Sequence, residues 1–177
     1  MEERKVAIFC SACAGIDEKY NEAAREVVHA LHSFGWTIVS GGTVKGTMKV
    51  IADASLECGG RHIGVIPRFM APVVYPHLSE VIWTDTMSER KEAMREGAAA
   101  VIALPGGVGT LDEIIETHVL AKLDRFSGRL FVLNIDGFYD PFIALLDHYV
   151  KTGMLDPYSR GLILFPQTAE ELVDYFK

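Results

Sequence analysis

Two short segments of this sequence combine glycine, basic and acidic residues at spacings that suggest chemistry. Residues 105–113 read PGGVGTLDE, and residues 88–91 read SERK. In the first segment Gly106, Gly107 and Gly109 allow the backbone to approach an anion closely. A helix that starts there presents free N–H groups and the positive end of its dipole. The segment therefore predicts a site for an anion such as a phosphate.

Carboxylates follow this glycine loop directly, although a phosphate site normally attracts positive charge. Thr110 and Glu113 spell the capping-box pattern T-x-x-E, in which the acid bonds back to the start of its helix. The same spacing occurs at residues 86–89 and 168–171. The residues alone leave two interpretations of Glu113 open, a helix cap or a functional carboxylate.

Arg90 and Lys91 lie near the expected start of another helix, where positive charge opposes the helix dipole. Two adjacent cations at this end suggest an anionic partner. The glycine loop is neither a Walker A loop, since no Gly-Lys-Ser/Thr ends it, nor a G-x-G-x-x-G fingerprint after the first strand. Nicotinamide binding is therefore disfavoured.

The elements that must position these residues alternate between short apolar runs and amphipathic segments. This alternation predicts a single α/β domain over residues 1–177, Rossmann-like, with a doubly wound parallel sheet and helices on both faces. The expected strands are 6–10, 36–39, 62–66, 80–83, 99–104, 130–134 and 162–165. The expected helices are 17–34, 48–56, 86–97, 110–123, 140–151 and 168–176.

Sheets of this kind bind ligands at the carboxyl ends of their strands. Three turns of small residues fall at that edge, at 11–15, 41–46 and 106–110. In the second turn, Gly42 and Gly46 are predicted to contact a substrate. The irregular stretch 67–79 is open to three interpretations: part of a substrate pocket, a partner contact or a plain surface loop.

Composition excludes several classes of protein. The 177 residues carry a net charge of −7, which disfavours a nucleic-acid-binding role. No apolar run is long enough to span a bilayer and no signal peptide is recognisable, so we expect a cytoplasmic protein without membrane contact. The C-x-x-C at 10–13 is interpreted as the end of a buried strand in preference to a redox or zinc motif. The histidines form no metal motif, so no metal is expected.

Taken together, the two segments resemble the signature of the LONELY GUY (LOG) family, the cytokinin riboside 5′-monophosphate phosphoribohydrolases. That signature pairs an E-R-K element with P-G-G-x-G-T-x-x-E, and both are present here. The resemblance covers almost the whole chain and includes residues 51–54, 63–67 and 134–139.

The resemblance implies a Rossmann-like fold, a homodimer with sites at the subunit interface, and no metal or redox cofactor. It implies hydrolysis of the N-glycosidic bond of an adenine-type nucleoside 5′-monophosphate, giving free base and ribose 5-phosphate. By matching positions, Arg90 and Glu113 would be the catalytic pair. The residues implied to hold substrate are Lys91, Gly106, Gly107, Val108, Gly109 and Thr110.

This chemistry explains a carboxylate beside an anion site. Glycosidic cleavage passes through an oxocarbenium-like transition state, and a carboxylate near the sugar stabilises that positive charge. The sequence departs from the family in two turns and in the E-R-K element. Residues 9–15 read FCSACAG in place of F-C-G-S-S-P-G, residues 41–49 read GGTVKGTMK in place of G-G-G-x-x-G-L-M-G, and Ser88 replaces a histidine. These changes bear on substrate choice, which remains open between a cytokinin nucleotide, AMP and other nucleotides.

The alternatives to hydrolysis are a carrier function and a decarboxylation. A nucleotide-binding or molybdopterin-type carrier would need the phosphate loop but not Glu113, and would bind without turnover. Amino-acid decarboxylation would need a cofactor such as pyridoxal phosphate on a Schiff-base lysine, for which the sequence offers no motif.

Overall fold

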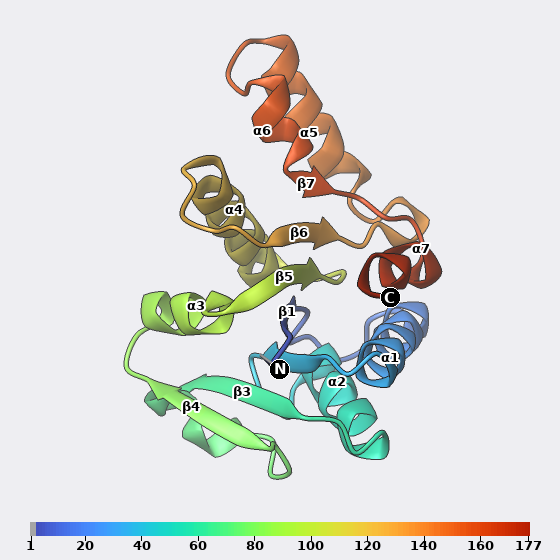
Figure 1. Cartoon of the computed structure of the whole chain (residues 1–177), viewed down its shortest axis with the longest axis vertical. Coiled ribbons are helices and arrows are strands. Elements are labelled where there is room, and N and C mark those ends of the chain that lie inside the picture. Colours follow the sequence, from blue (N-terminus) through green and yellow to red (C-terminus); the bar gives the residue numbers. More distant parts are fainter. Residues whose placement is uncertain (1–2) are drawn as a thin grey trace.

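The computed structural model describes residues 3–177 and contains one parallel seven-stranded sheet (Figure 1). The strand order is β4-β3-β2-β1-β5-β6-β7, and each neighbouring pair is parallel. The strands are β1 (Lys5–Phe9), β2 (Thr37–Ser40), β3 (His62–Pro67), β4 (Glu80–Thr84), β5 (Ala98–Ala103), β6 (Arg129–Val132) and β7 (Ile163–Leu164). The predicted α/β class and parallel sheet are confirmed.

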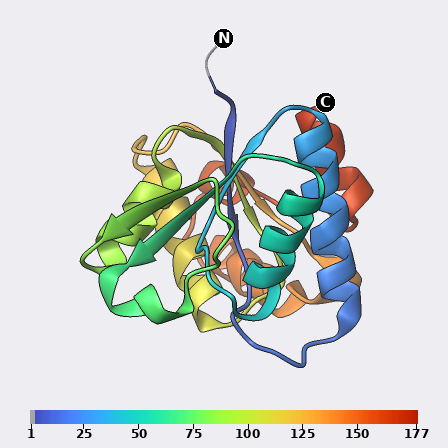
Figure 2. The same cartoon turned by 90° about the horizontal axis from the view of Figure 1, so that it is seen from below.

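Helices cover both faces of the sheet, as Figures 1 and 2 show from two directions. One layer holds α1 (Glu18–Ser33), α2 (Gly46–Glu57) and α7 (Ala169–Val173). The other holds α3 (Met87–Arg95), α4 (Val108–Lys122) and α5 (Asp140–Lys151), with the short α6 (Pro157–Gly161) beside α5. Short 3-10 helices lie at Arg68–Val73, Ile135–Gly137 and Asp174–Phe176.

The central strand β1 separates two apolar cores. Val6 and Ile8 pack into the core beneath α1, α2 and α7, whereas Ala7 and Phe9 pack into the core beneath α3, α4 and α5. This alternation follows from the two-residue period of a strand. Because both faces of β1 are buried, the run reads as continuously apolar in the sequence.

Several boundaries differ from the sequence-based expectation. Helices α2 and α4 each begin two residues earlier than expected, because glycines at their starts enter the helix. The segment 67–79 is partly a 3-10 helix, and its Val74 forms an isolated β-bridge with Thr43. The short α6 was not expected; Asp156 caps it through a hydrogen bond from the Ser159 N–H.

The sheet order places a topological switch point beside β1. Strands β2, β3 and β4 extend to one side of β1, and β5, β6 and β7 extend to the other. The connections on the two sides cover opposite faces, which leaves a crevice outside the carboxyl ends of β1 and β5. Both chemistry-bearing segments meet at that crevice.

Candidate active site

A cavity of about 250 Å³ opens at the carboxyl ends of β1, β2 and β5. Its walls come from the turn after β1, the start of the turn after β2, the first turns of α3, and the loop and first turns of α4. The lining residues are Ile8, Phe9, Cys10, Ser11, Ala12, Cys13, Gly41, Met48, Met87, Arg90, Lys91, Met94, Gly107, Val108, Gly109, Thr110, Asp112 and Glu113. The structure therefore brings the glycine loop and the E-R-K element together.

The glycine loop forms an open helix N-terminus at the cavity. Gly107 is the N-cap of α4 and supplies no side chain to the first N–H groups, which leaves them free for an anion. A Cβ atom at Gly106 would lie 2.7 Å from the Cβ of Thr110, so this glycine is required by space. The side chain of Val108 is 87% exposed at the cavity mouth.

Glu113 is not part of a capping box. Thr110 lies inside α4 and is buried, whereas the N-cap is three residues earlier, at Gly107. In contrast, Thr86 and Thr168 do cap their helices, accepting hydrogen bonds from the Glu89 and Glu171 N–H groups. The capping interpretation of Glu113 is wrong, and its carboxylate lines the cavity instead.

Arg90 lies beneath the cavity with only 6% of its surface exposed. Its Nε donates to the carbonyl oxygen of Val65 at 3.0 Å, and its Nη2 donates to the carbonyl oxygen of Gly41 at 3.1 Å. Burial lowers the pKa of Arg90, and the nearby Glu113 carboxylate counteracts this effect. An arginine remains charged in such a place, so the cavity floor carries a fixed positive charge.

The electrostatics of Glu113 are those of a functional carboxyl group. Burial raises its pKa to about 7, the charge of Asp112 adds to the shift, and the Arg90 guanidinium opposes it. A carboxyl group with a pKa near neutrality, in a cavity and facing an arginine, is typical of an active site.

Lys91 lines the same cavity but is already paired. Its Nζ lies 2.8 Å from Oδ2 of Asp112 and also forms an ion pair with Glu116. Glu116 in turn accepts a hydrogen bond from Nη2 of Arg95 at 2.7 Å. The hydrogen bond to Asp112, and then that to Glu116, raises the pKa of Lys91. These contacts connect α3 to α4 and fix the relative positions of the two motifs.

Of the three glycines at 41, 42 and 46, only Gly41 lines the cavity. Gly42 and Gly46 have positive φ angles of 64° and 53°, and both are packed against backbone. A Cβ atom on Gly42 would lie 2.7 Å from Cα of Gly64, and one on Gly46 would lie 2.7 Å from the carbonyl oxygen of Ser11. The structure thus gives these two glycines a role in shaping the turns.

Sequence reasoning missed the apolar wall of the cavity and the residue that holds its loop. Met48, Met87 and Met94 lie on three different turns of α2 and α3, so no short motif contains them. Tyr139 is buried and donates from its hydroxyl to the carbonyl oxygen of Leu104 at 2.8 Å. It therefore holds the end of β5, where the glycine loop begins.

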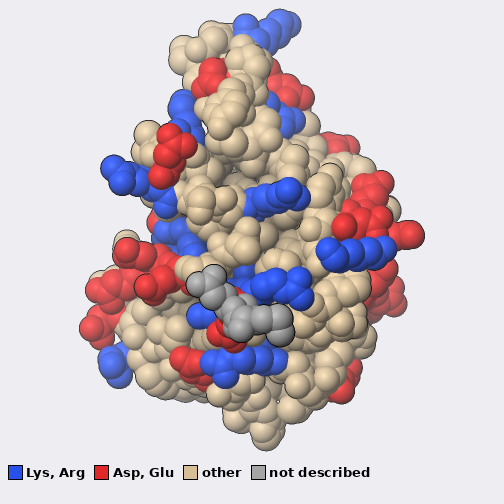
Figure 3. All heavy atoms as spheres, in the orientation of Figure 1, with Lys and Arg blue, Asp and Glu red and all other residues tan. Residues whose placement is uncertain are grey.

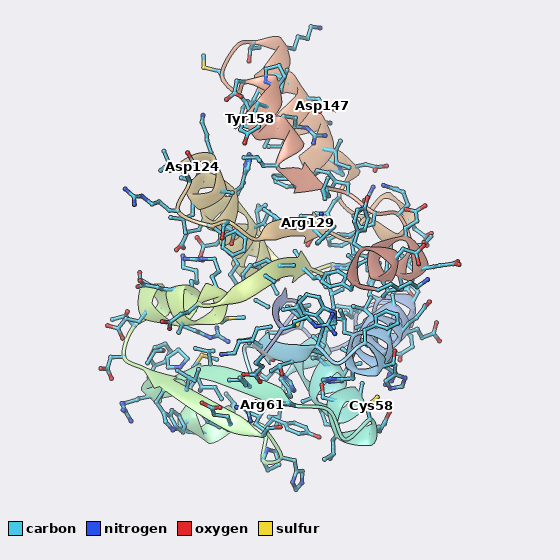
Figure 4. The ribbon with its side chains drawn as sticks, viewed as in Figure 1. Cys58, Arg61, Asp124, Arg129, Asp147 and Tyr158 are labelled. Atoms are coloured by element: carbon cyan, nitrogen blue, oxygen red, sulfur yellow. The ribbon has the colours of Figure 1, made fainter. Side chains whose placement is uncertain are left out.

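The cysteines do not form a disulfide. Cys10 is buried, Cys13 is exposed, and both line the cavity. Burial raises the pKa of the Cys10 thiol, which suits a packing role. Cys58 lies at the end of α2, at the periphery of the molecule (Figure 4). The interpretation of both C-x-x-C cysteines as the end of a buried strand holds for Cys10 and is wrong for Cys13, which is exposed.

Residues 3–177 lack the features of two other classes of protein. No helix in that range has both the length and the apolar character needed to cross a membrane. No group of three or more His, Cys, Asp or Glu side chains in the same range is placed to hold a metal ion.

Comparisons with known proteins agree with this fold and this site. A sequence profile of the family described as "Possible lysine decarboxylase" matches residues 48–176. The rice protein named cytokinin riboside 5′-monophosphate phosphoribohydrolase LOG is 39% identical over 96% of this chain and 71% of its own length. Arabidopsis thaliana LOG2, which has the same enzyme name, is 35% identical over 96% of this chain and 81% of its own length.

Among solved structures, the molybdenum cofactor binding protein of Rippkaea orientalis has a TM-score of 0.73 at 18% identity. The match covers 99% of this chain and 96% of the other, and at this identity it supports the fold alone. Fold, paired motifs and sequence identity together define a Rossmann-like protein whose two motifs meet at one cavity. The chain belongs to the LOG family of phosphoribohydrolases.

Proposed function

We propose that this protein hydrolyses the N-glycosidic bond of an adenine-type nucleoside 5′-monophosphate, either a cytokinin riboside 5′-monophosphate or AMP. The products are the free base and ribose 5-phosphate. The observation that carries the proposal is that Glu113, no longer explained as a helix cap, lies in the same cavity as the open N-terminus of α4. Its relatives in rice and Arabidopsis are named as phosphoribohydrolases.

In this proposal some residues of the cavity bind the nucleotide and Glu113 stabilises the charge that develops during the reaction. The N–H groups at the start of α4, at residues 107–110, bind the 5′-phosphate. As the bond between the sugar and the base breaks, its electron pair leaves with the base and positive charge develops on the ribose. The ionised Glu113 stabilises that charge or orients the water whose oxygen then bonds to the sugar carbon, and the proton that this water gives up ends on the departing base. Arg90, at the floor of the cavity, positions the nucleotide.

Decarboxylation through a pyridoxal phosphate Schiff base is disfavoured by the state of Lys91. A Schiff base forms from a neutral amine, and a lysine in this role has a lowered pKa. The lysine that lines this cavity is instead held by Asp112 and Glu116, which raise its pKa.

A role in binding nucleic acid is also disfavoured. The net charge is −7, and on the face shown in Figure 3 the Lys and Arg side chains lie between groups of Asp and Glu. A binder of an extended phosphate backbone presents a basic stripe. We therefore propose a small nucleotide as the partner at the cavity.

The direct test is to incubate the purified protein with AMP, GMP, CMP and isopentenyladenine riboside 5′-monophosphate and to separate the products by chromatography. We expect free base and ribose 5-phosphate from the adenine-type nucleotides, and release slowed about a hundredfold or more in Arg90→Ala and Glu113→Gln. Tight binding of these nucleotides without any release by the wild-type protein would contradict the proposal and favour the carrier function.

We also propose that the protein is a homodimer that pairs through α4. Four apolar side chains along this helix are 39–59% exposed at four-residue spacing: Leu111, Ile115, Val119 and Leu123. The helix is tied to α6, where Tyr158 is 75% exposed (Figure 4), by a hydrogen bond of 2.7 Å from His118 to the carbonyl oxygen of Ser159. A continuous apolar stripe of this kind is typical of an interface.

The dimer is tested by sedimentation. Wild-type protein is expected to sediment as a dimer, and Ile115→Lys combined with Val119→Lys as a monomer. Leu56→Lys is the matched control, because Leu56 is 54% exposed on α2, in the opposite helical layer. A monomeric wild-type protein, or a dimer that survives both lysines, would contradict the α4 interface.

A further inference from the structure

The position of Arg90 depends on a residue far from it in the sequence. Arg90 extends from the first turn of α3 beneath the cavity, where it meets the turn that follows β2. Its Nη2 donates to the carbonyl oxygen of Gly41 at 3.1 Å, 49 residues earlier in the chain. With the bond from Nε to Val65, this uses two of the five N–H donors of the guanidinium. Within residues 3–177 the remaining three form no further hydrogen bond.

The guanidinium occupies the space that a side chain at position 41 would need. A Cβ atom there would lie 3.3 Å from Cζ of Arg90, closer still to its Nη2, and 2.6 Å from Sδ of Met48. Real Cβ atoms essentially never come within 3.0 Å of such neighbours. Gly41 does not have a positive φ, unlike Gly42, so its backbone conformation is open to alanine. An alanine at position 41 would therefore displace the ends of the Arg90 and Met48 side chains, although the backbone conformation would accept it.

We propose that Gly41 is a positioning residue, which holds the catalytic guanidinium of Arg90 in place through its carbonyl oxygen and its missing side chain. The expected loss of turnover rests on the proposed function. The role of Gly41 in positioning Arg90 does not. The proposal assigns the effect of substituting Gly41 to Arg90 and not to Met48, so the substitution should matter far less once Arg90 is absent. A misplacement of about 1 Å in a catalytic group costs up to roughly a hundredfold in rate.

The kinetic test is a double-mutant cycle of Gly41→Ala and Arg90→Ala. Gly41→Ala is expected to lower kcat/KM about ten- to a hundredfold in the wild-type background and less than twofold in the Arg90→Ala background. Gly161→Ala is the matched control, because a Cβ atom at Gly161 meets nothing within 4 Å and its φ is not positive. An equal loss in both backgrounds would show that Gly41 acts through Met48 or through the fold, and would overturn the proposal.

A second measurement does not depend on turnover. The Glu113 carboxyl carbon can be titrated by NMR in the four proteins of the cycle, with the signal assigned by its loss in Glu113→Gln. The ionisable groups that influence this carboxyl are Cys10, Arg90, Lys91, Arg95, Asp112 and Tyr139. Of these, Arg90 is the one that contacts Gly41. Arg90→Ala should raise the pKa of Glu113, because the guanidinium lowers it.

Gly41→Ala should then change the pKa of Glu113 when Arg90 is present and leave it unchanged in the Arg90→Ala background. If the wild-type protein hydrolyses no nucleotide, the proposed function fails while this titration still decides the role of Gly41. Gly41→Ala alone is one case in which the protein could fail to fold. If adding Arg90→Ala then restores folding, the proposal is supported. If the double variant also does not fold, the proposal is overturned. An unchanged pKa in Gly41→Ala, with a raised pKa in Arg90→Ala, also overturns it.

Discussion

The first turns of α3 and α4 carry the same four-residue pattern and use it in opposite ways. At α3, Thr86 caps the helix, and Glu89 accepts a hydrogen bond from the Asp85 N–H at 2.8 Å. At α4, Thr110 is the third residue of the helix, and Glu113 lines the cavity. The same T-x-x-E spacing therefore caps the N-terminus of α3 and places a carboxylate in the cavity at the N-terminus of α4.

The glycines explain the difference. Before α3 no glycine lies between Gly64 and Thr86, and the threonine side chain takes the cap position. Before α4, Gly107 takes the N-cap position and the helix begins at Val108, two residues before Thr110. A glycine cap leaves the first N–H groups unpaired, which costs stability but creates an anion site. The comparison shows that the T-x-x-E pattern marks a cap only where the helix begins directly after its threonine.

The largest effect expected from this comparison is on turnover. Glu113→Gln should lower kcat by about a hundredfold or more, because preorganised charge at a developing cation is worth that much. Glu171→Gln is the matched control, since Glu171 occupies the same place in a true cap on α7 and its amide can still accept the hydrogen bond from the Gln167 N–H. Its kcat should equal that of the wild type, measured by release of free base. Unchanged turnover in a folded Glu113→Gln would remove Glu113 from the reaction.

The Glu113 carboxyl group should lower the stability of the folded protein when it is ionised, although the same ionised form is expected to promote turnover. Its pKa of about 7 in the folded protein exceeds the ordinary value of 4.5, so the native state binds the proton more tightly than the unfolded chain does. The stabilisation from this proton is complete below about pH 4.5 and is lost as the pH rises through about 7.

Glu113→Gln removes this dependence, so it should unfold like the wild type near pH 4 and be more stable by up to about 3 kcal/mol near pH 8. Urea unfolding at the two pH values measures the difference. The control is Glu171→Gln, whose stability relative to wild type should be the same at both. A Glu113→Gln protein that is less stable than wild type at pH 8 would mean that the Arg90 partner outweighs burial.

The pH profile of the reaction distinguishes roles for Glu113. As a stabiliser, base or nucleophile, this residue acts in its ionised form, so kcat/KM should fall about tenfold per pH unit below about pH 7 and level off above it. A profile that falls as the pH rises through 7 would instead identify Glu113 as a proton donor. Measuring hydrolysis of the best adenine-type nucleotide from pH 5 to 9 gives the sign.

The fold was largely predictable because its buried strands are distinct in the sequence. Residues 62–67 and 98–103 are apolar runs bounded by glycine or proline, and both are strands. The short α6 escaped prediction because five residues after Asp156 are too few to show a helical period. The start of α4 was misplaced because glycine was treated as loop, although it can serve as an N-cap.

The site was predictable only where its residues are adjacent in the chain. The glycine loop and the E-R-K element were found as motifs, and both reach the cavity. The pairing of Lys91 with Asp112 and Glu116 joins two helices, and no local pattern indicates it. The contact between Gly41 and Arg90 likewise depends on how β2 and α3 are placed by the sheet, which only the folded structure shows.

The smallest expected effect is a difference in unfolding free energy between substitutions at Thr168, which caps α7, and at Thr110, which caps no helix. Thr168→Val removes an oxygen that accepts a hydrogen bond from the Glu171 N–H at 3.1 Å, so it should cost about 1 kcal/mol of unfolding free energy. Thr110→Val removes a hydroxyl that caps nothing and keeps the shape of a buried side chain, so it should cost less than half as much. Both are measured by urea unfolding at pH 7 with a common slope. An equal loss at the two positions would mean that Thr110 supports the start of α4 in solution, and the comparison between α3 and α4 would then rest on Glu113 alone.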